Sequence, residues 1–169
     1  SLRDIRLPAA LDYIRANKLN QQVLGPADAQ LGVIASGHAM ALIHDLFAEL
    51  RIGPDDLAKA SLAVFKVAVT WPLEPRGIEE FVRDKKRVLV LDPKRRFLEP
   101  QIRDLLFNMK KRPSIIGKKD EMGQAFLSET RQLEAMDGAH ALRHLLGQKA
   151  KGNLASALDN FLARQQPAN

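Results

Sequence analysis

The sequence predicts an α/β protein in which a mostly parallel sheet carries helices on both faces. Short apolar segments of strand length recur along the chain. They are separated by segments in which apolar residues recur every three or four positions, as on one face of a helix. This alternation favours parallel strands joined by right-handed crossovers. The composition, with 46% hydrophobic and 27% charged residues, is typical of a globular protein.

The N-terminal third predicts one helix followed by two strands. Four apolar residues have helical spacing there: Leu7, Ala10, Leu11 and Ile14. Pro8 would lie in the first turn, where proline is tolerated. Residues 21–24 and 31–35 are predicted strands, and the segment Gly25-Pro26-Ala27-Asp28 between them favours a turn. We expect these strands to pair as an antiparallel hairpin that gives the sheet an antiparallel edge.

The middle of the chain predicts further strands and helices. A helix ending near Gly53-Pro54 is indicated by Met40, Ile43, Leu46, Phe47 and Leu50. Residues 62–67 form a predicted buried strand, and prolines keep residues 70–75 out of a helix. A short helix is indicated by Ile78, Phe81 and Val82. Residues 87–91 are the clearest strand in the sequence.

The last third predicts one more strand and three helices. Asp92-Pro93 ends the preceding strand. A longer amphipathic helix is indicated by Leu98, Ile102, Leu105, Leu106 and Met109. Residues 113–117 form a short last strand. Two tail helices are indicated by Leu133, Met136, Leu142, Leu145 and Leu146, and by Leu154, Leu158, Phe161 and Leu162. We expect Asn153 to be the N-cap of the second.

One domain is expected over residues 1–169, because the sequence has no internal repeat and no low-complexity linker. It would have a core over about 19–120 and a helical extension over about 133–165. The chain begins with Ser1, which we interpret as a fragment of a larger multidomain enzyme. No apolar run approaches the roughly 18 residues that span a bilayer, so a cytoplasmic location is expected. The absence of cysteine excludes disulfides, thiolate metal sites and iron–sulfur ligation within this sequence.

The charge distribution raises the question of anion binding. Lys and Arg outnumber Asp and Glu by 26 to 20, which gives a net charge of +6. Four basic clusters would form a phosphate-binding surface if the fold brought them together: Lys85-Lys86-Arg87, Lys94-Arg95-Arg96, Lys110-Lys111-Arg112 and Lys118-Lys119. However, each cluster adjoins a predicted element end, where solvated charge is common, and no aromatic residues are interleaved with them. We therefore do not expect nucleic-acid binding. A stand-alone basic module that binds anions or nucleic acid is the alternative function.

Three motifs resemble known sites without completing them. Residues 32–38 have glycines spaced as in a phosphate loop, but His38-Ala39 replaces the required Lys and Ser/Thr, so a strand-to-helix turn is the better interpretation. His140 and His144 share a helix face, but Ala141 replaces the metalloprotease glutamate and no third ligand has a suitable spacing. Residues 136–138 lack the first glycine of a thiamine diphosphate motif and are interpreted as helix surface. We therefore assign no catalytic, cofactor-binding or metal-binding residue.

The remaining candidates for ligand contact follow the predicted strands. Open α/β sheets bind ligands at the carboxyl ends of their strands. Six residues are expected at that edge: Ser36, Gly37, Trp71, Glu74, Lys94 and Arg95. The amides of Ser36 and Gly37 would also start a helix, where an anion is favoured. The simpler interpretation is that Trp71 packs a loop while the charges are solvated. A self-contained enzyme that uses these residues is a further hypothesis.

Five segments in the same order resemble the middle region of the indolepyruvate ferredoxin oxidoreductases, of the large fused type that depends on thiamine diphosphate. They are Arg6–Ala10, Leu31–Gly37, Trp71–Pro75, Arg103–Asn108 and Ile116–Glu121, and the resemblance extends from about Leu7 to Glu134. In that family the region resembles a transketolase C-terminal domain. The resemblance implies a three-layer α/β/α fold with a mostly parallel five-stranded sheet and one antiparallel strand.

The resemblance also implies a parent reaction. The family oxidatively decarboxylates arylpyruvates to arylacetyl-coenzyme A and passes electrons to ferredoxin, an iron–sulfur protein acceptor. It uses thiamine diphosphate, magnesium and iron–sulfur clusters that other domains of the polypeptide hold. The implied role here is that of a structural and assembly domain without catalytic residues, inactive in isolation, in a parent enzyme that forms a homodimer. Residues 91–95 depart from the family pattern, because relatives often carry paired acidic residues after this strand.

Overall fold

The computed structural model describes residues 2–93 and 95–165, in which five strands form one sheet with the order β1-β3-β2-β4-β5. The strands are β1 (Asn20–Leu24), β2 (Leu31–Ser36), β3 (Leu62–Val67), β4 (Arg87–Leu91) and β5 (Ser114–Ile116). β2 to β5 are mutually parallel, whereas β1 is antiparallel to β3. The predicted fold, a mostly parallel five-stranded sheet with one antiparallel strand, is confirmed.

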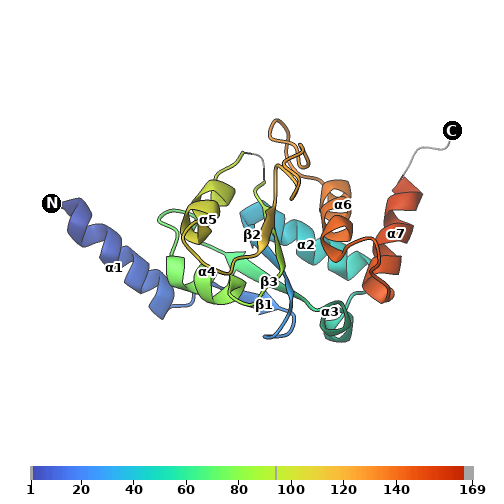
Figure 1. The fold of residues 1–169 in the computed structure, drawn as a ribbon, viewed down its shortest axis with the longest axis horizontal. Helices are drawn as coiled ribbons and strands as arrows, with labels where there is room; N and C mark the ends of the chain where they lie inside the picture. Colours follow the sequence, from blue (N-terminus) through green and yellow to red (C-terminus); the bar gives the residue numbers. More distant parts are fainter. Residues whose placement is uncertain (1, 94, 166–169) are drawn as a thin grey trace.

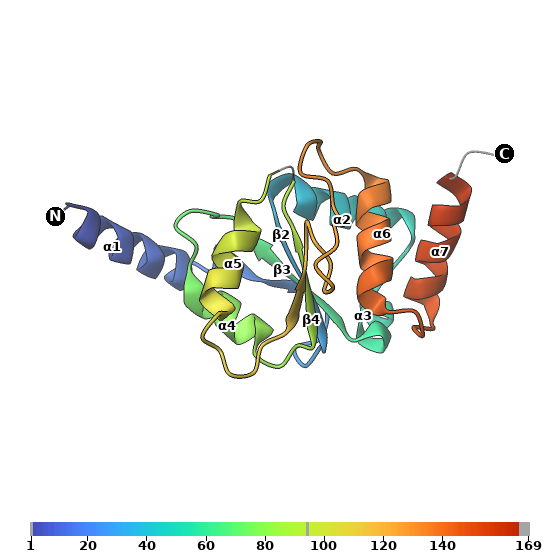
Figure 2. The same ribbon diagram turned by 45° about the horizontal axis from the view of Figure 1, so that its top comes forward.

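Helices cover both faces of the sheet and complete the three layers (Figures 1 and 2). One face carries α2 (Gly37–Glu49), α3 (Pro54–Ala60), α6 (Ala135–Leu146) and α7 (Asn153–Gln165). The other face carries α4 (Pro75–Val82) and α5 (Leu98–Leu106). None of the helices in the described part of the chain has the length and apolar character needed to cross a membrane.

The apolar strands are explained by burial on both faces. Along β4, Leu89 and Leu91 pack toward α2 and α6, whereas Val88 and Val90 pack toward α4 and α5. Successive side chains of a strand point to opposite faces, and a parallel strand with helices on both sides therefore needs a continuous apolar run. The sequence shows this pattern in β2, β3 and β4, which explains why their positions could be predicted.

The predicted hairpin is wrong, although the antiparallel edge is present. β1 pairs with β3, with Asn20 opposite Val67, and β3 lies between β1 and β2. The apolar strand β2 gains parallel partners on both sides, and the polar strand β1 takes the exposed edge. The side chain of Asn20 fixes this edge, because its Oδ1 accepts hydrogen bonds from the amides of Ala68 and Val69.

The N-terminal helix α1 (Leu2–Ala16) extends away from the sheet (Figure 1). It begins earlier than the apolar positions indicate, so Pro8 lies inside the helix and the prediction of a first-turn proline is wrong. The C-terminal end of α1 is the part that contacts the domain. There Ile14 is buried, and Arg15 forms ion pairs with Glu74 and Glu80 of the α4 region.

Helix boundaries differ from the predictions at two further places. Pro54, predicted only to follow a helix end, is also the first residue of the helix α3, which was not predicted. Asn153 does not cap α7. Its side-chain amide donates instead to the carboxylate of Asp56 over 3.0 Å, which links the start of α7 to α3. A short polar side chain near a helix start predicts a cap from local sequence alone. Here the side chain instead bonds a partner 97 residues away in the sequence.

Candidate functional site

The strand order places a potential ligand crevice between β2 and β4. From β2 the chain passes through α2 and α3 to β3 on one side, and from β3 through α4 to β4 on the other side of β2. The connections therefore leave neighbouring strands toward opposite faces of the sheet. In open α/β sheets such a switch point opens a crevice at the carboxyl ends of the strands, where ligands bind. Here Ser36 and Asp92 flank that position.

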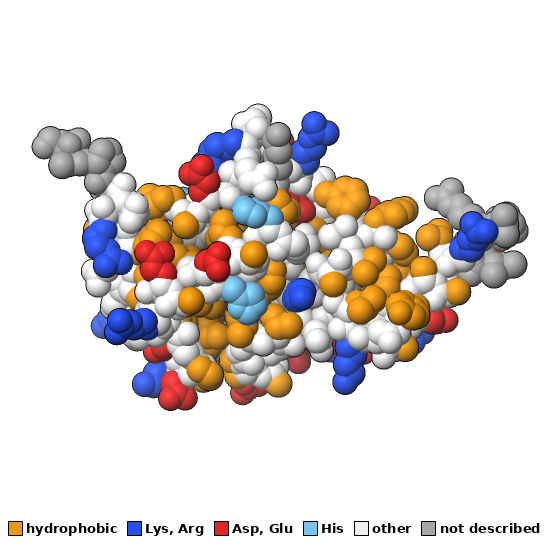
Figure 3. All heavy atoms as spheres, turned by 180° about the vertical axis from the view of Figure 1, so that it is seen from behind, with side chains coloured by type: hydrophobic (Ala, Val, Ile, Leu, Met, Phe, Trp, Pro, Cys, Tyr) orange, Lys and Arg blue, Asp and Glu red, His pale blue; other side chains and the backbone are white. Residues whose placement is uncertain are grey.

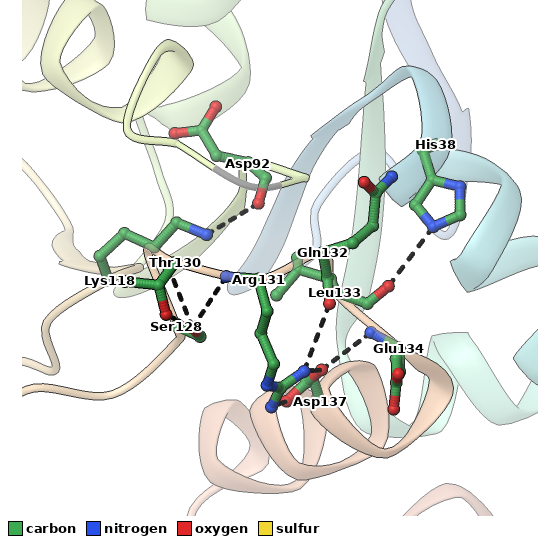
Figure 4. A network of polar contacts seen from close by, with 10 residues as sticks. All are labelled: His38, Asp92, Lys118, Ser128, Thr130, Arg131, Gln132, Leu133, Glu134 and Asp137. Carbon is green, nitrogen blue, oxygen red and sulfur yellow. Dashed lines mark hydrogen bonds and ion pairs between the residues drawn. The ribbon is translucent and has the colours of Figure 1, made fainter.

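The crevice is filled by the chain's own segment 117–134, which connects β5 to α6 and is called the strap below (Figure 4). Leu133 of the strap is 2% exposed. Its amide donates to the carbonyl oxygen of Pro93, just beyond β4, over 2.9 Å. Its own carbonyl accepts from Nε2 of His38, in the first turn of α2, at 3.4 Å. One buried leucine thus joins both sides of the switch point.

Lys118 anchors the other end of the strap. Its Nζ atom donates to the carbonyl oxygen of Asp92 over 2.9 Å, and its amide donates to the Glu99 carboxylate over 2.8 Å. The Lys118 side chain is buried, and burial lowers the pKa of its ammonium group even though carboxylates surround it. The ammonium group therefore holds the strap against the end of β4 and is not available to a ligand.

Asp92 is a structural cap at this edge. Its buried carboxylate accepts from the amides of Leu98 and Glu99, over 2.7 and 3.0 Å, at the start of α5. Burial raises the pKa of this carboxyl, and the two amide hydrogen bonds oppose the rise. From the sequence, Asp92-Pro93 is predicted only to end a strand. The missed signal is an acidic residue between a buried strand and the next helix, where free amides favour a carboxylate.

Glu99, in the first turn of α5, is the second buried carboxylate that sequence analysis missed. It is 1% exposed and lies 3.0 Å from Nη2 of Arg96 and 3.4 Å from Nε of Arg103. Together with the amide of Lys118, these groups satisfy its oxygens, as a buried carboxylate requires. The Glu99 carboxylate therefore fixes the positions of both Arg96 and Arg103.

The six predicted site residues do not form one cluster. Ser36 is buried at the end of β2, and its side chain makes no capping hydrogen bond. Gly37 is exposed, has φ +49°, and would have open space at a Cβ position, so its role is the turn from β2 into α2. Arg95 is exposed in the connection after β4. Lys94 lies outside the described residues.

Trp71 and Glu74 lie on the loop after β3, on the other side of β2. The Trp71 side chain is 61% exposed. Glu74 is buried, and its carboxylate accepts from the amides of Arg76 and Gly77 over 2.9 and 2.8 Å, which makes it the cap of α4. Among the five candidates that the structure describes, no hydrogen bond or ion pair joins any two. Their role as a ligand site stays a prediction.

The two histidines of α6 contact neighbouring side chains of the strap. The rings of His140 and His144 lie 5.1 and 4.7 Å from the Phe126 ring. His144 Nε2 also contacts a carboxylate oxygen of Glu121 at 2.8 Å, and this hydrogen bond lowers the pKa of Glu121. Over residues 2–93 and 95–165, no group of three or more potential metal ligands converges. Gly138, interpreted above as helix surface, is instead buried against Leu42 of α2.

The attachment of the strap to α6 should depend on pH. Arg131 holds Asp137 through two hydrogen bonds of 2.7 Å, and the Asp137 carboxylate also accepts from the amide of Glu134. The Arg131 guanidinium, as the largest cause, lowers the pKa of Asp137 below its usual value. A carboxylate with a lowered folded pKa stabilises the fold above its unfolded pKa, and this contribution is lost as the pH falls through the folded pKa.

We therefore expect Asp137→Ala to cost about 1 kcal/mol of unfolding free energy at pH 7, as for loss of a helix cap, and progressively less below pH 4. Urea unfolding at pH 7 and pH 3 measures both values. Asp159→Ala serves as the control, because it removes an ion pair with Arg143 in which the carboxylate is more exposed than that of Asp137. An equal cost of Asp137→Ala at both pH values would show that its charge does not hold the strap.

These features define a class of protein: a doubly wound α/β domain whose ligand crevice is closed by its own connection to two C-terminal helices. Within that class the comparison with family models is specific. Residues 21–168 match the family described as the indolepyruvate oxidoreductase domain, and the chain belongs to this family.

The comparison with one individual relative agrees with this assignment. The chain is 36% identical over 81 residues to the indolepyruvate oxidoreductase subunit IorA of Methanothermobacter thermautotrophicus. The aligned part covers 47% of this chain and 12% of that relative, so the chain spans a small part of its length. A solved structure of a split-gene transketolase, an inactive β4 tetramer, aligns with TM-score 0.42 and 15% identity over 82% of this chain and 40% of that one.

Proposed function

We propose that this chain is a structural and assembly domain of an indolepyruvate oxidoreductase and that it contributes no catalytic residue. The observation that carries the proposal is Leu133. It occupies the crevice at which an open α/β sheet would bind a ligand, and it is hydrogen-bonded to the segments after both β2 and β4. The buried charges at the same edge support the proposal, because Asp92, Glu99 and Lys118 are all engaged in holding α5 and the strap.

The parent enzyme, in this proposal, oxidatively decarboxylates arylpyruvates to arylacetyl-coenzyme A and transfers the electrons to ferredoxin. The residues of this chain do not fit its cofactors. The sequence has no cysteine for a cluster, and the described residues bring no three metal-ligating side chains together for a magnesium–diphosphate group. We assign thiamine diphosphate, magnesium, the clusters and the coenzyme A and ferredoxin contacts to other domains of a cytoplasmic, homodimeric enzyme.

Two exposed aromatic side chains are suited to contact a neighbouring domain. Trp71 and Phe97 are 61% and 52% exposed. Gln101 brings their segments together, because its side-chain amide donates to the carbonyl oxygens of both Thr70 and Phe97. Exposed aromatic residues that lie close together are typical of interface anchors. This aromatic pair, Trp71 and Phe97, is the surface at which we expect another domain of the same polypeptide to pack.

The test uses the full-length oxidoreductase that contains this chain. We expect dye reduction with indolepyruvate and phenylpyruvate that requires coenzyme A and thiamine diphosphate. Ser36→Ala and Arg95→Gln should change kcat less than twofold, because neither residue contacts the reacting groups. Trp71→Ala should lower the thermal stability of the full-length enzyme, while Met122→Ala, which removes another exposed side chain, should not.

Each outcome has a definite meaning. Loss of more than tenfold in kcat for Ser36→Ala, at unchanged stability, would place catalysis in this domain and overturn the assembly role. A folded, cofactor-loaded enzyme that turns over no arylpyruvate would overturn the parent reaction.

A further inference from the structure

A pocket of about 700 Å³ lies beside the edge strand β5, between the end of α5 and the start of the strap. Five of its lining residues are called the arginine pocket below: Arg96, Arg103, Phe107, Arg112 and Lys119. Three of the four basic clusters in the sequence each contribute one of these residues. The fourth does not, because Lys85 is buried at the opposite end of the strands, where it donates to the carbonyl oxygen of Ala29.

The guanidinium groups of the pocket are held in place by groups of the domain itself. Arg103 donates from Nη2 to the carbonyl oxygen of Ile115 at 3.3 Å and pairs with Glu99 through Nε. Arg112 donates from Nη1 to the carbonyl oxygens of Leu106 and Phe107 at the end of α5. A guanidinium has five N–H donors, so each retains donors for a ligand. Side chains that are already ordered lose little entropy on binding.

Phe107 gives the pocket an aromatic wall. Its side chain is 73% exposed, although it is large and apolar. The guanidinium carbon of Arg112 lies 5.9 Å from the centre of the ring, within the range of cation–π contacts. An exposed ring beside several cations suits a ligand that combines a flat aromatic group with negative charge.

The carboxylates that also line the pocket are engaged elsewhere. Asp120 accepts, through Oδ1, from the amides of Met122 and Gln124 in its own turn. Glu121 contacts His144 of α6. By contrast Lys119 is exposed and makes no side-chain hydrogen bond or ion pair within the described residues. The donors that remain available at this pocket are therefore cationic.

We propose that the arginine pocket binds a small phosphorylated aromatic compound of the nucleoside diphosphate class. Its volume lies within the usual range of ligand pockets, about 300–1,000 Å³. A pocket of this volume fits a small ligand better than a nucleic acid, which needs a continuous basic surface. On the face shown in Figure 3, the Lys and Arg side chains lie mostly singly around the outline of the molecule. The proposal does not depend on the assembly role argued above.

The test is isothermal titration calorimetry of the 169-residue chain with ADP, pyrophosphate, adenosine and a 15-nucleotide RNA as probes. We expect ADP to bind one to one, and more tightly than pyrophosphate or adenosine. Lys119→Gln should lower the affinity for ADP about tenfold, the loss expected for one charge-assisted hydrogen bond. Phe107→Ala should lower the affinity for ADP but leave the affinity for pyrophosphate unchanged.

Lys149→Gln is the matched control, because it removes an exposed charge that does not line this pocket. It should leave ADP binding unchanged, and circular dichroism should show all three variants folded. Absence of ADP binding at millimolar concentration would overturn the proposal. So would RNA binding that ADP does not displace, or an equal effect of Lys119→Gln and Lys149→Gln, since either result would indicate general attraction to the basic surface.

Discussion

Gly25→Ala is expected to lower the free energy of unfolding by about 3 kcal/mol, from a strained backbone plus overpacking. Gly25 has φ +86°, and an alanine Cβ there would lie 2.1 Å from the carbonyl oxygen of Leu62 and 2.6 Å from the Cα of Ala63. Both atoms belong to the backbone of β3 and cannot move aside without breaking its pairing with β2. Equilibrium urea unfolding followed by circular dichroism measures the change.

Gly123→Ala separates the two contributions. Gly123 has nearly the same backbone angle, φ +82°, but a Cβ there would meet nothing within 4 Å. Its substitution should therefore cost only about 1–2 kcal/mol, the penalty of the left-handed conformation alone. Equal costs at the two glycines would show that the turn after β1 has room for a Cβ atom that the structure does not indicate.

Leu133→Ala is expected to cost about 2–4 kcal/mol, because it removes a fully buried side chain whose cavity cannot close around rigid strand ends. Leu133 packs in the apolar core on the face of α2 and α6. The same change should speed hydrogen exchange of the Leu133 amide, which is bonded to Pro93. The two measurements together report whether the side chain and the backbone of the strap are held as one unit.

Gln132→Ala provides the control, since the neighbouring side chain is exposed and its loss should change stability by less than about 0.5 kcal/mol. A cost below about 1 kcal/mol for Leu133→Ala would mean that the strap does not fill the crevice. That result would contradict the main observation behind the proposed assembly role.

The sequence predicts this fold where burial alone determines it. β3 and β4 were located residue for residue, because strands covered on both faces need continuous apolar runs. The helices α2 and α4 were located by the spacing of their apolar residues. The partner of β1 was not predictable in this way. Its sequence, Asn-Gln-Gln-Val-Leu, indicates an edge strand but carries no information on which neighbour it will meet.

The contacts at the carboxyl ends of the strands were only partly predictable from the sequence. The six expected residues were chosen because they follow strands, yet Glu74 caps a helix and Ser36 makes no capping bond. The residues that organise the edge are Asp92, Glu99, Lys118 and Leu133. Lys118 and Leu133 act through partners distant in sequence, Asp92 and His38 respectively. Local patterns do not record such pairs.

The basic clusters illustrate the same limit. In the sequence they adjoin element ends, and solvation explains each of them separately. Only the fold shows that Arg96, Arg112 and Lys119 line one pocket while Lys85 is buried elsewhere.

The position of α6 determines the route that the chain must take after β5. β5 lies at one edge of the sheet, and α5, which precedes it, lies on the face opposite α6. To reach α2 and α6 the chain has to return across the carboxyl ends of β4 and β2. The return path and the ligand position of the fold therefore coincide in space. In this domain, the connection that adds the two C-terminal helices is therefore the same segment that closes the crevice.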